Sequence, residues 1–111
     1  MIARVWRGWT AHHNADAYEA VLRTETIPNA LAKNIGGLRE IQALRLERLG
    51  ETEFLCIMWF DDMAAVRAFA AARGLAADEY EKSVISQRAR ELLRRYDFKV
   101  EYYDVKEIVR T

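Results

Sequence analysis

The feature that most restricts the fold is an uninterrupted apolar run, FLCIMWF, at Phe54–Phe60, with two aspartates directly after it. Seven apolar residues are too few to cross a membrane, and without polar alternation they predict a strand that is buried on both faces. Helices of the same chain can cover one face of such a strand. Because the chain has only 111 residues, we expect a second copy to cover the other face, which predicts a homodimer.

Length and composition are typical of one globular domain, residues 1–111, because 51% of the residues are hydrophobic and can form a core. Seventeen basic residues balance seventeen acidic ones and no basic run is present, so we expect no nucleic-acid partner. No apolar run has the length of a signal peptide or a membrane span, and the single Cys56 cannot form an internal disulfide. These features predict a cytoplasmic protein without a membrane partner.

The spacing of apolar residues predicts seven elements. In chain order they are a strand at 2–10, a helix from Asn14 to about Thr26, strands at 38–49 and 54–60, a helix from Asp61 or Asp62 to Arg73-Gly74, a helix from Ser86 to Tyr96, and a strand from Phe98 to about Ile108. Pro28 either kinks the first helix or opens a second short segment, which Gly36-Gly37 ends. Residues 38–49 also fit a helical spacing, but a β-hairpin is the more economical interpretation because Gly50 leads into the apolar run.

This order of elements is the split βαβ arrangement. It predicts an α+β domain of the ferredoxin-like class, in which helices cover one face of an antiparallel sheet. The uncovered face of that sheet would be buried in the homodimer.

Short motifs are spread over nearly the whole chain. They are WRGWT at 6–10, the helix from Tyr18 to Pro28, Gly37 before the second strand, IMWFDD at 57–62 running into AVRAFA, and Tyr80 before a short helix and a tyrosine-rich last strand. Together they resemble the antibiotic biosynthesis monooxygenase-like family of dimeric α+β barrels. The resemblance implies two sheets packed face to face across a dimer axis, with a cleft between the helices and the sheet of each subunit. Because the motifs are mostly apolar, they indicate the fold more specifically than the chemistry.

The haem-degrading branch of that family uses a strand-one asparagine, a tryptophan in the helix after the third strand, and a later histidine as the iron ligand. The matching positions here hold Arg7 and Phe69, and no histidine follows His13. We therefore expect no haem degradation of that kind. His12 and His13 lack metal-ligand spacing and are interpreted as surface turn residues. Since no dinucleotide fingerprint or phosphate-binding loop is present either, we expect no cofactor and no metal.

Candidate site residues are polar and aromatic side chains on otherwise apolar elements. They are Arg7, Tyr80 and His13 as catalytic residues, and Trp9, Tyr18 and Trp59 as substrate-binding residues. Oxygenation without a cofactor needs an electron-rich substrate held as its anion, with a donor such as Arg7 on the substrate oxygen. Trp9 and Trp59 are suited to hold a planar ring, Tyr18 and Tyr80 could close the cleft, and His13 or Tyr80 could serve as general base.

These candidates also have structural explanations. Trp59 could be a core residue, and Arg7 could pair with Asp104 or Glu101. Trp59 would face the cleft only if its side of the pleat points away from the dimer. Two functions therefore stay open: a cofactor-independent monooxygenase acting on a small planar aromatic or polyketide-like substrate, and a noncatalytic small-ligand-binding or interaction module on the same dimeric barrel. We expect the enzyme, with its substrate in the cleft between helices and sheet.

Overall fold

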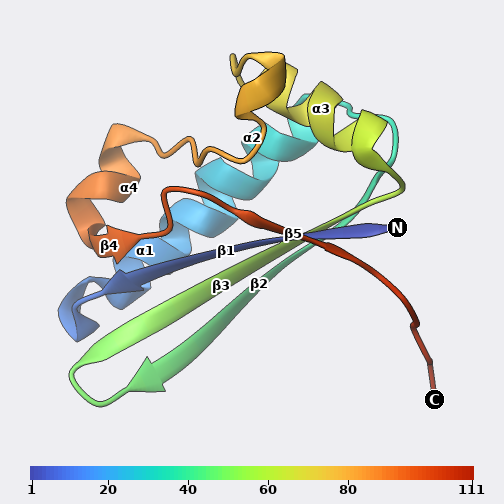
Figure 1. Cartoon of the computed structure of the whole chain (residues 1–111). Helices are drawn as coiled ribbons and strands as arrows, with labels where there is room; N and C mark the ends of the chain where they lie inside the picture. The colour runs from blue at the N-terminus through green and yellow to red at the C-terminus, as the bar shows by residue number, and fades with distance from the viewer.

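One antiparallel five-stranded sheet carries the helices on one of its faces in the computed structural model, which describes residues 1–111 (Figure 1). The strands are β1 (Ile2–Thr10), β2 (Leu38–Arg48), β3 (Glu51–Phe60), β4 (Leu93–Tyr96) and β5 (Glu101–Asp104). Their order is β2-β3-β1-β4, and β5 pairs with the same edge of β1 as β4 does, further toward the start of β1. The α+β class and the antiparallel ferredoxin-like sheet are therefore confirmed.

The helices follow in three groups. They are a continuous helical segment that contains α1 (Ala15–Val21) and α2 (Ile27–Ala32), then α3 (Met63–Ala72), and finally the short α4 (Gln87–Leu92). A π-helical stretch at Leu22–Thr26 joins α1 to α2. Pro28 lies in the first turn of α2, where its missing N–H group costs least, so the predicted second segment begins there. Asp62 caps α3 by accepting a hydrogen bond from the Ala65 N–H group. No helix is both long enough and apolar enough to span a bilayer.

The pleat decides which side chains meet the helices. On β1 the even-numbered residues are buried, whereas Val5, Arg7 and Trp9 remain partly exposed. β3 pairs antiparallel with β1, opposing Trp6 with Cys56, so its even-numbered residues share the helix-covered face. Within one chain the apolar run of β3 is therefore covered on one side only, and its odd-numbered side chains lie on the open face.

Two clusters of buried side chains form the core. The first contains Trp6, Ala15, Tyr18, Val21, Leu22, Phe54, Ala89 and Val100. The second contains Ile2, Met58, Phe60, Ala65, Val66 and Phe69. Helices α1 and α4 contribute buried residues to the first cluster, and helix α3 contributes buried residues to the second.

The last third of the chain differs from the prediction. The helix expected to reach Tyr96 ends at Leu92, and Leu93–Tyr96 form β4 against the end of β1. Extended backbone there satisfies hydrogen-bonding groups of β1 that a helix would leave unpaired. The expected strand from Phe98 to Ile108 is confined to β5, and Phe98 is 77% exposed. The chain after β5 leaves the body of the domain (Figure 1).

Candidate functional site

A cavity of about 420 Å³ lies between the helices and the sheet. Strands β1, β2 and β3 form one wall, and the helical segment through α2, the end of α3 and the start of α4 form the other. Thirteen of its twenty lining residues are hydrophobic, so the space suits a mostly apolar ligand. Its volume lies within the range of sites that bind small organic molecules.

Arg4 and Trp6 of β1 line this cavity through the even-numbered side of the pleat. Arg4 is only 6% exposed, its Nη1 lies 3.7 Å from the Sδ atom of Met58, and its guanidinium carbon lies 5.8 Å from the centroid of the Phe69 ring. The Nε of Arg4 and the Nε1 of Trp6 are buried without any hydrogen-bond acceptor. Buried donors without partners are rare and costly.

A second arginine, Arg73, approaches the same cavity from the C-terminal end of α3. Its Nη2 donates a hydrogen bond to the Val84 carbonyl over 2.7 Å, and its guanidinium carbon lies 4.9 Å from the centroid of Phe69. Burial, with a smaller contribution from the positive charge of Arg4, lowers the pKa of Arg73 to about 10. Neither Arg4 nor Arg73 forms an ion pair, and the only acidic residue of the cavity wall, Glu25, lies 3.5 Å from Arg88.

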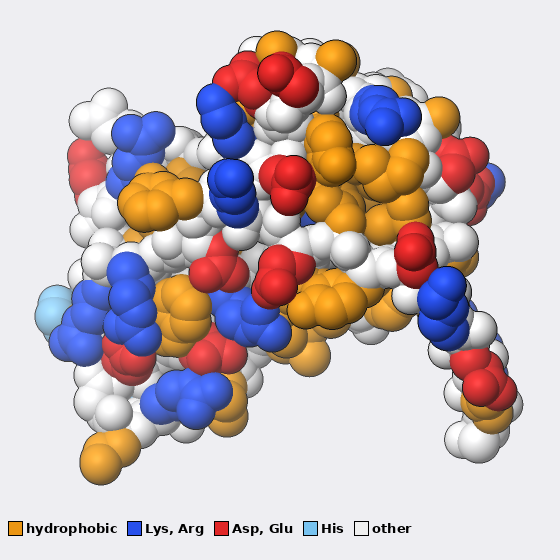
Figure 2. Space-filling model, in the orientation of Figure 1, with side chains coloured by type: hydrophobic (Ala, Val, Ile, Leu, Met, Phe, Trp, Pro, Cys, Tyr) orange, Lys and Arg blue, Asp and Glu red, His pale blue; other side chains and the backbone are white.

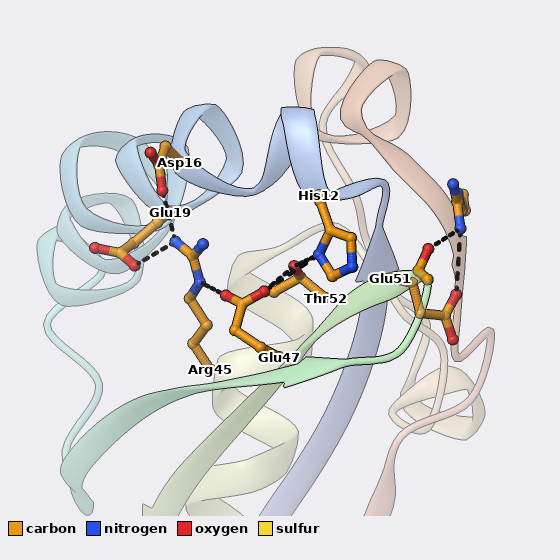
Figure 3. Close-up of polar contacts among 9 residues, drawn as sticks. His12, Asp16, Glu19, Arg45, Glu47, Glu51 and Thr52 are labelled. Atoms are coloured by element: carbon orange, nitrogen blue, oxygen red, sulfur yellow. Dashed lines mark hydrogen bonds and ion pairs between the residues drawn. The ribbon is translucent and has the colours of Figure 1, made fainter.

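Most arginines elsewhere in the molecule pair with carboxylates, as Figure 3 illustrates for Arg45. Arg45 of β2 lies 2.8 Å from a carboxylate oxygen of Asp16 in α1 and 2.6 Å from one of Glu47. Thr52 donates a hydrogen bond to Glu47, and the Nδ1 atom of His12 lies 3.1 Å from the Thr52 hydroxyl. These contacts tie the start of the helical segment to the β-hairpin. On the face drawn in Figure 2, basic and acidic side chains are likewise mixed.

The phenol of Tyr18 and the thiol of Cys56, which also line the cavity, are neutral near pH 7. Tyr18 is 3% exposed, and burial, together with the neighbouring Cys56, raises the pKa of its phenol. Burial also raises the pKa of the Cys56 thiol to about 11, although Arg4 opposes this shift. Neither group can act as a strong base at neutral pH.

Three of the residues proposed from the sequence lie on the opposite face of the sheet. Arg7 pairs with Glu101 at 3.6 Å, the structural alternative considered for it, and its side chain is 36% exposed. The indole of Trp9 donates to Glu53, and that of Trp59 donates to Gln42. The expectation that Arg7, Trp9 and Trp59 converge in the cleft is wrong. They belong to the odd-numbered series of β1 and β3, which faces away from the helices.

Of the remaining three candidates, only Tyr18 lines the cavity, as expected. Tyr80 is not among the lining residues; its ring packs against that of Tyr102 at 5.6 Å, and its carbonyl accepts a hydrogen bond from the Tyr102 hydroxyl. His13 is exposed in the turn before α1, and its side chain forms no hydrogen bond or ion pair. The structure therefore places neither proposed base in the cavity, and none of the His, Cys, Asp and Glu residues form a group of three that could hold a metal ion.

Sequence reasoning missed Arg4, Trp6 and Arg73. Residue spacing gave no signal that favours Arg4, because the other residues on its side of the strand (Ile2, Trp6 and Gly8) and on the side of Arg7 (Ala3, Val5 and Trp9) are all apolar or small. Arg73 looked like an ordinary helix terminus, and only the packed structure shows its ring contact with Phe69.

No protein-family model matches the chain, and no curated protein matches it. Solved structures do. A Bacillus cereus protein named as a candidate antibiotic biosynthesis monooxygenase superposes with a TM-score of 0.67 at 12% identity, over 99% of this chain and 95% of that one. The chain has the ferredoxin-like fold. Rv0793 from Mycobacterium tuberculosis gives a TM-score of 0.59 at 18% identity, over 98% of each chain. A dimeric ferredoxin-like protein from an uncultured marine organism gives 0.61 at 10% identity, over 98% of this chain and 97% of that one. The predicted likeness in fold to antibiotic biosynthesis monooxygenase-like proteins is thus confirmed.

Proposed function

We propose that the protein is a cofactor-independent monooxygenase that oxidises a small planar aromatic or polyketide-like substrate in the cavity between helices and sheet. The observation that carries this proposal is the buried guanidinium of Arg4, which has no ion-pair partner and lies on the wall of a mostly apolar cavity. A phenolate or enolate oxygen would accept a hydrogen bond from this guanidinium and would compensate its charge.

The reaction would draw its electrons from the substrate. The substrate anion passes an electron to O₂, a new C–O bond forms, and loss of water from the peroxide leaves a carbonyl group. One methylene group and one O₂ thereby give one carbonyl group and one water, without any external reductant. Arg4 would stabilise the oxyanion during electron transfer, the role that was expected of Arg7.

The cavity contains no strong base, but its charges reduce the need for one. Arg4 and Arg73 both favour the ionised form of a bound phenol or enol, which lowers the pKa of that ligand. The walls formed by Trp6, Tyr18 and Phe69 would exclude water and strengthen this effect. A substrate that is already weakly acidic in water could therefore ionise on binding.

A noncatalytic ligand-binding module is the second candidate. It is favoured by the protonation of Tyr18 and Cys56, which therefore cannot take a proton from a weakly acidic substrate, and by the pairing of the wall residue Glu25 with Arg88. The name of the Bacillus cereus neighbour supports the enzyme instead.

We also propose that the open face of the sheet is buried in a homodimer. Leu44 and Leu46 of β2 are 46% and 49% exposed there, beside the partly exposed Leu55 and Ile57 of β3. A stable interface would bury more than about 1,000 Å². The marine neighbour is described as dimeric, which supports this arrangement.

Oxygen uptake by purified protein tests the enzymatic proposal. We expect the wild type to accelerate O₂ consumption with anthrone- or hydroquinone-like compounds without added cofactor. Arg4→Met should lower the rate by about a hundredfold, as loss of one oxyanion donor does, while the matched Arg7→Met variant keeps the wild-type rate. Stoichiometric metal, flavin or haem in the active protein would contradict the cofactor-free mechanism. Ligand binding without any accelerated uptake would favour the noncatalytic module.

A further inference from the structure

Two arginine side chains, Arg4 and Arg73, line the cavity without a carboxylate partner. The guanidinium carbons of Arg4 and Arg73 lie 5.8 Å and 4.9 Å from the centroid of the same ring, Phe69. No carboxylate pairs with either of them, although every other arginine that lacks an ion pair is solvent-exposed. Unpaired charges removed from water are expensive, and two of like sign repel each other. The protein itself therefore leaves the charge of these two arginines uncompensated.

Most of the N–H groups of the Arg73 guanidinium have no hydrogen-bond partner in the protein. A guanidinium carries five N–H donors, and the protein uses one nitrogen of Arg73 for the Val84 carbonyl. Arg39 shows how this chain binds a carboxylate, because its Nε and Nη2 donate to the two carboxylate oxygens of Asp61. A carboxylate entering the cavity could receive hydrogen bonds from Arg73 in the same way.

We propose that the substrate is an aromatic carboxylic acid, whose oxidisable ring oxygen meets Arg4 and whose carboxylate binds Arg73. This assignment rests on the proposed function of the cavity and narrows its substrate class. A carboxylate fits the second cation better than a second phenol does, because it is ionised at pH 7 without a base, and the cavity offers none. The hydrophobic majority of the lining then packs the ring between the two charged ends.

Binding of a product-like acid tests the assignment independently of turnover. We would titrate anthraquinone-2-carboxylate and anthraquinone-2-carboxamide into the protein by calorimetry, since neither quinone can be oxidised further. The wild type should bind the carboxylate at least tenfold more tightly than the carboxamide. Arg73→Met should reduce this preference to less than twofold, and Arg73→Lys should retain part of it.

Arg67→Met is the matched control. Arg67 lies on the same helix α3, is exposed, and stands over the ring of Tyr80 outside the cavity, so this variant should keep the full preference. Equal affinity of the wild type for both quinones, or a preference that survives in Arg73→Met, would overturn the assignment. Oxidation of uncharged anthrones with no preference for acids would support the monooxygenase activity and contradict the carboxylate site. Tight binding of the acid without oxygen uptake would contradict the monooxygenase activity and support the carboxylate site.

Discussion

Arg73 and Phe69 lie one helical turn apart at the end of α3, with the guanidinium carbon of Arg73 4.9 Å from the centroid of the ring. Cation–π attraction and the hydrogen bond to Val84 hold the charge in place. Burial and the nearby Arg4 oppose it, since they lower the pKa of Arg73 to about 10. A ligand site and a stability cost therefore coincide at one residue, as is common where proteins retain unfavourable groups for function.

Arg73→Met should raise the free energy of unfolding by about 1 kcal/mol at pH 7, because relief of the buried charge outweighs one lost hydrogen bond and one cation–π contact. The pKa of Arg73 is lower in the folded state than in the unfolded chain, so the unfolded chain binds more protons above about pH 10. The free energy of unfolding of the wild type therefore increases as the pH rises through the folded-state pKa. The gain should therefore shrink between pH 7 and pH 11. Urea unfolding at both pH values measures it, with Arg67→Met as a control expected to stay within about 0.5 kcal/mol of the wild type. A marked loss of stability in Arg73→Met would contradict this account.

Most of the fold was readable from the sequence, but the direction of the pleat was not. The strand at 2–10 and the hairpin that leads into Phe54–Phe60 follow from apolar spacing and turn residues. On β1, however, each side of the strand carries one arginine and one tryptophan: Arg4 with Trp6, and Arg7 with Trp9. Composition cannot tell such sides apart. A one-residue change of register exchanges them, so the site was assigned to the wrong face.

The prediction for the region after α4 was wrong for another reason. Leu92, Leu93 and Tyr96 fit a helix face, and all three do pack against the first core cluster. Leu93 and Tyr96 reach that cluster from β4 instead, since the unpaired edge of β1 offers backbone hydrogen bonds that local periodicity does not reveal.

Two aspartate substitutions in β3 should separate folding from association. Phe60 is fully buried in the core of one chain and does not line the cavity, so Phe60→Asp should prevent folding by placing a charge in a dry interior at a cost of several kcal/mol. Ile57 lies on the open face, so Ile57→Asp should leave the circular dichroism of a folded protein but convert the dimer to a monomer. Light scattering and circular dichroism report the two effects. Leu49→Asp, in the exposed hairpin turn, is the control. A monomeric wild type at micromolar concentration would refute the dimer.

Gly37→Ala should destabilise the protein by about 2 kcal/mol or more. Gly37 has a φ of +91°, which alanine adopts only with strain, and an added Cβ would lie 2.8 Å from the Cβ of Ala65 in α3. Gly36→Ala is the matched control, because an added Cβ there meets nothing within 4 Å. Its free energy of unfolding should change by less than about 0.5 kcal/mol. Equal urea midpoints for the two variants would show that the contact between Gly37 and α3 is not tight.

Cys56 offers a direct probe of the cavity, because its thiol lines the same space as Arg4 and Trp6. Burial raises the pKa of the Cys56 thiol to about 11, and only the thiolate reacts with iodoacetamide. At pH 8 alkylation should therefore be about a hundredfold slower in the native protein than in urea-unfolded chain, for which an ordinary thiol pKa applies. The native rate should rise about tenfold for each pH unit up to about pH 11, since the thiolate fraction does so below the pKa.

Anthraquinone-2-carboxylate should slow the alkylation of Cys56 in the native protein further while leaving the rate in the unfolded chain unchanged. The Arg7→Met variant should show the same protection. A native rate that reaches a plateau below pH 9, or one that the ligand does not change, would mean that Cys56 does not face a ligand-binding cavity.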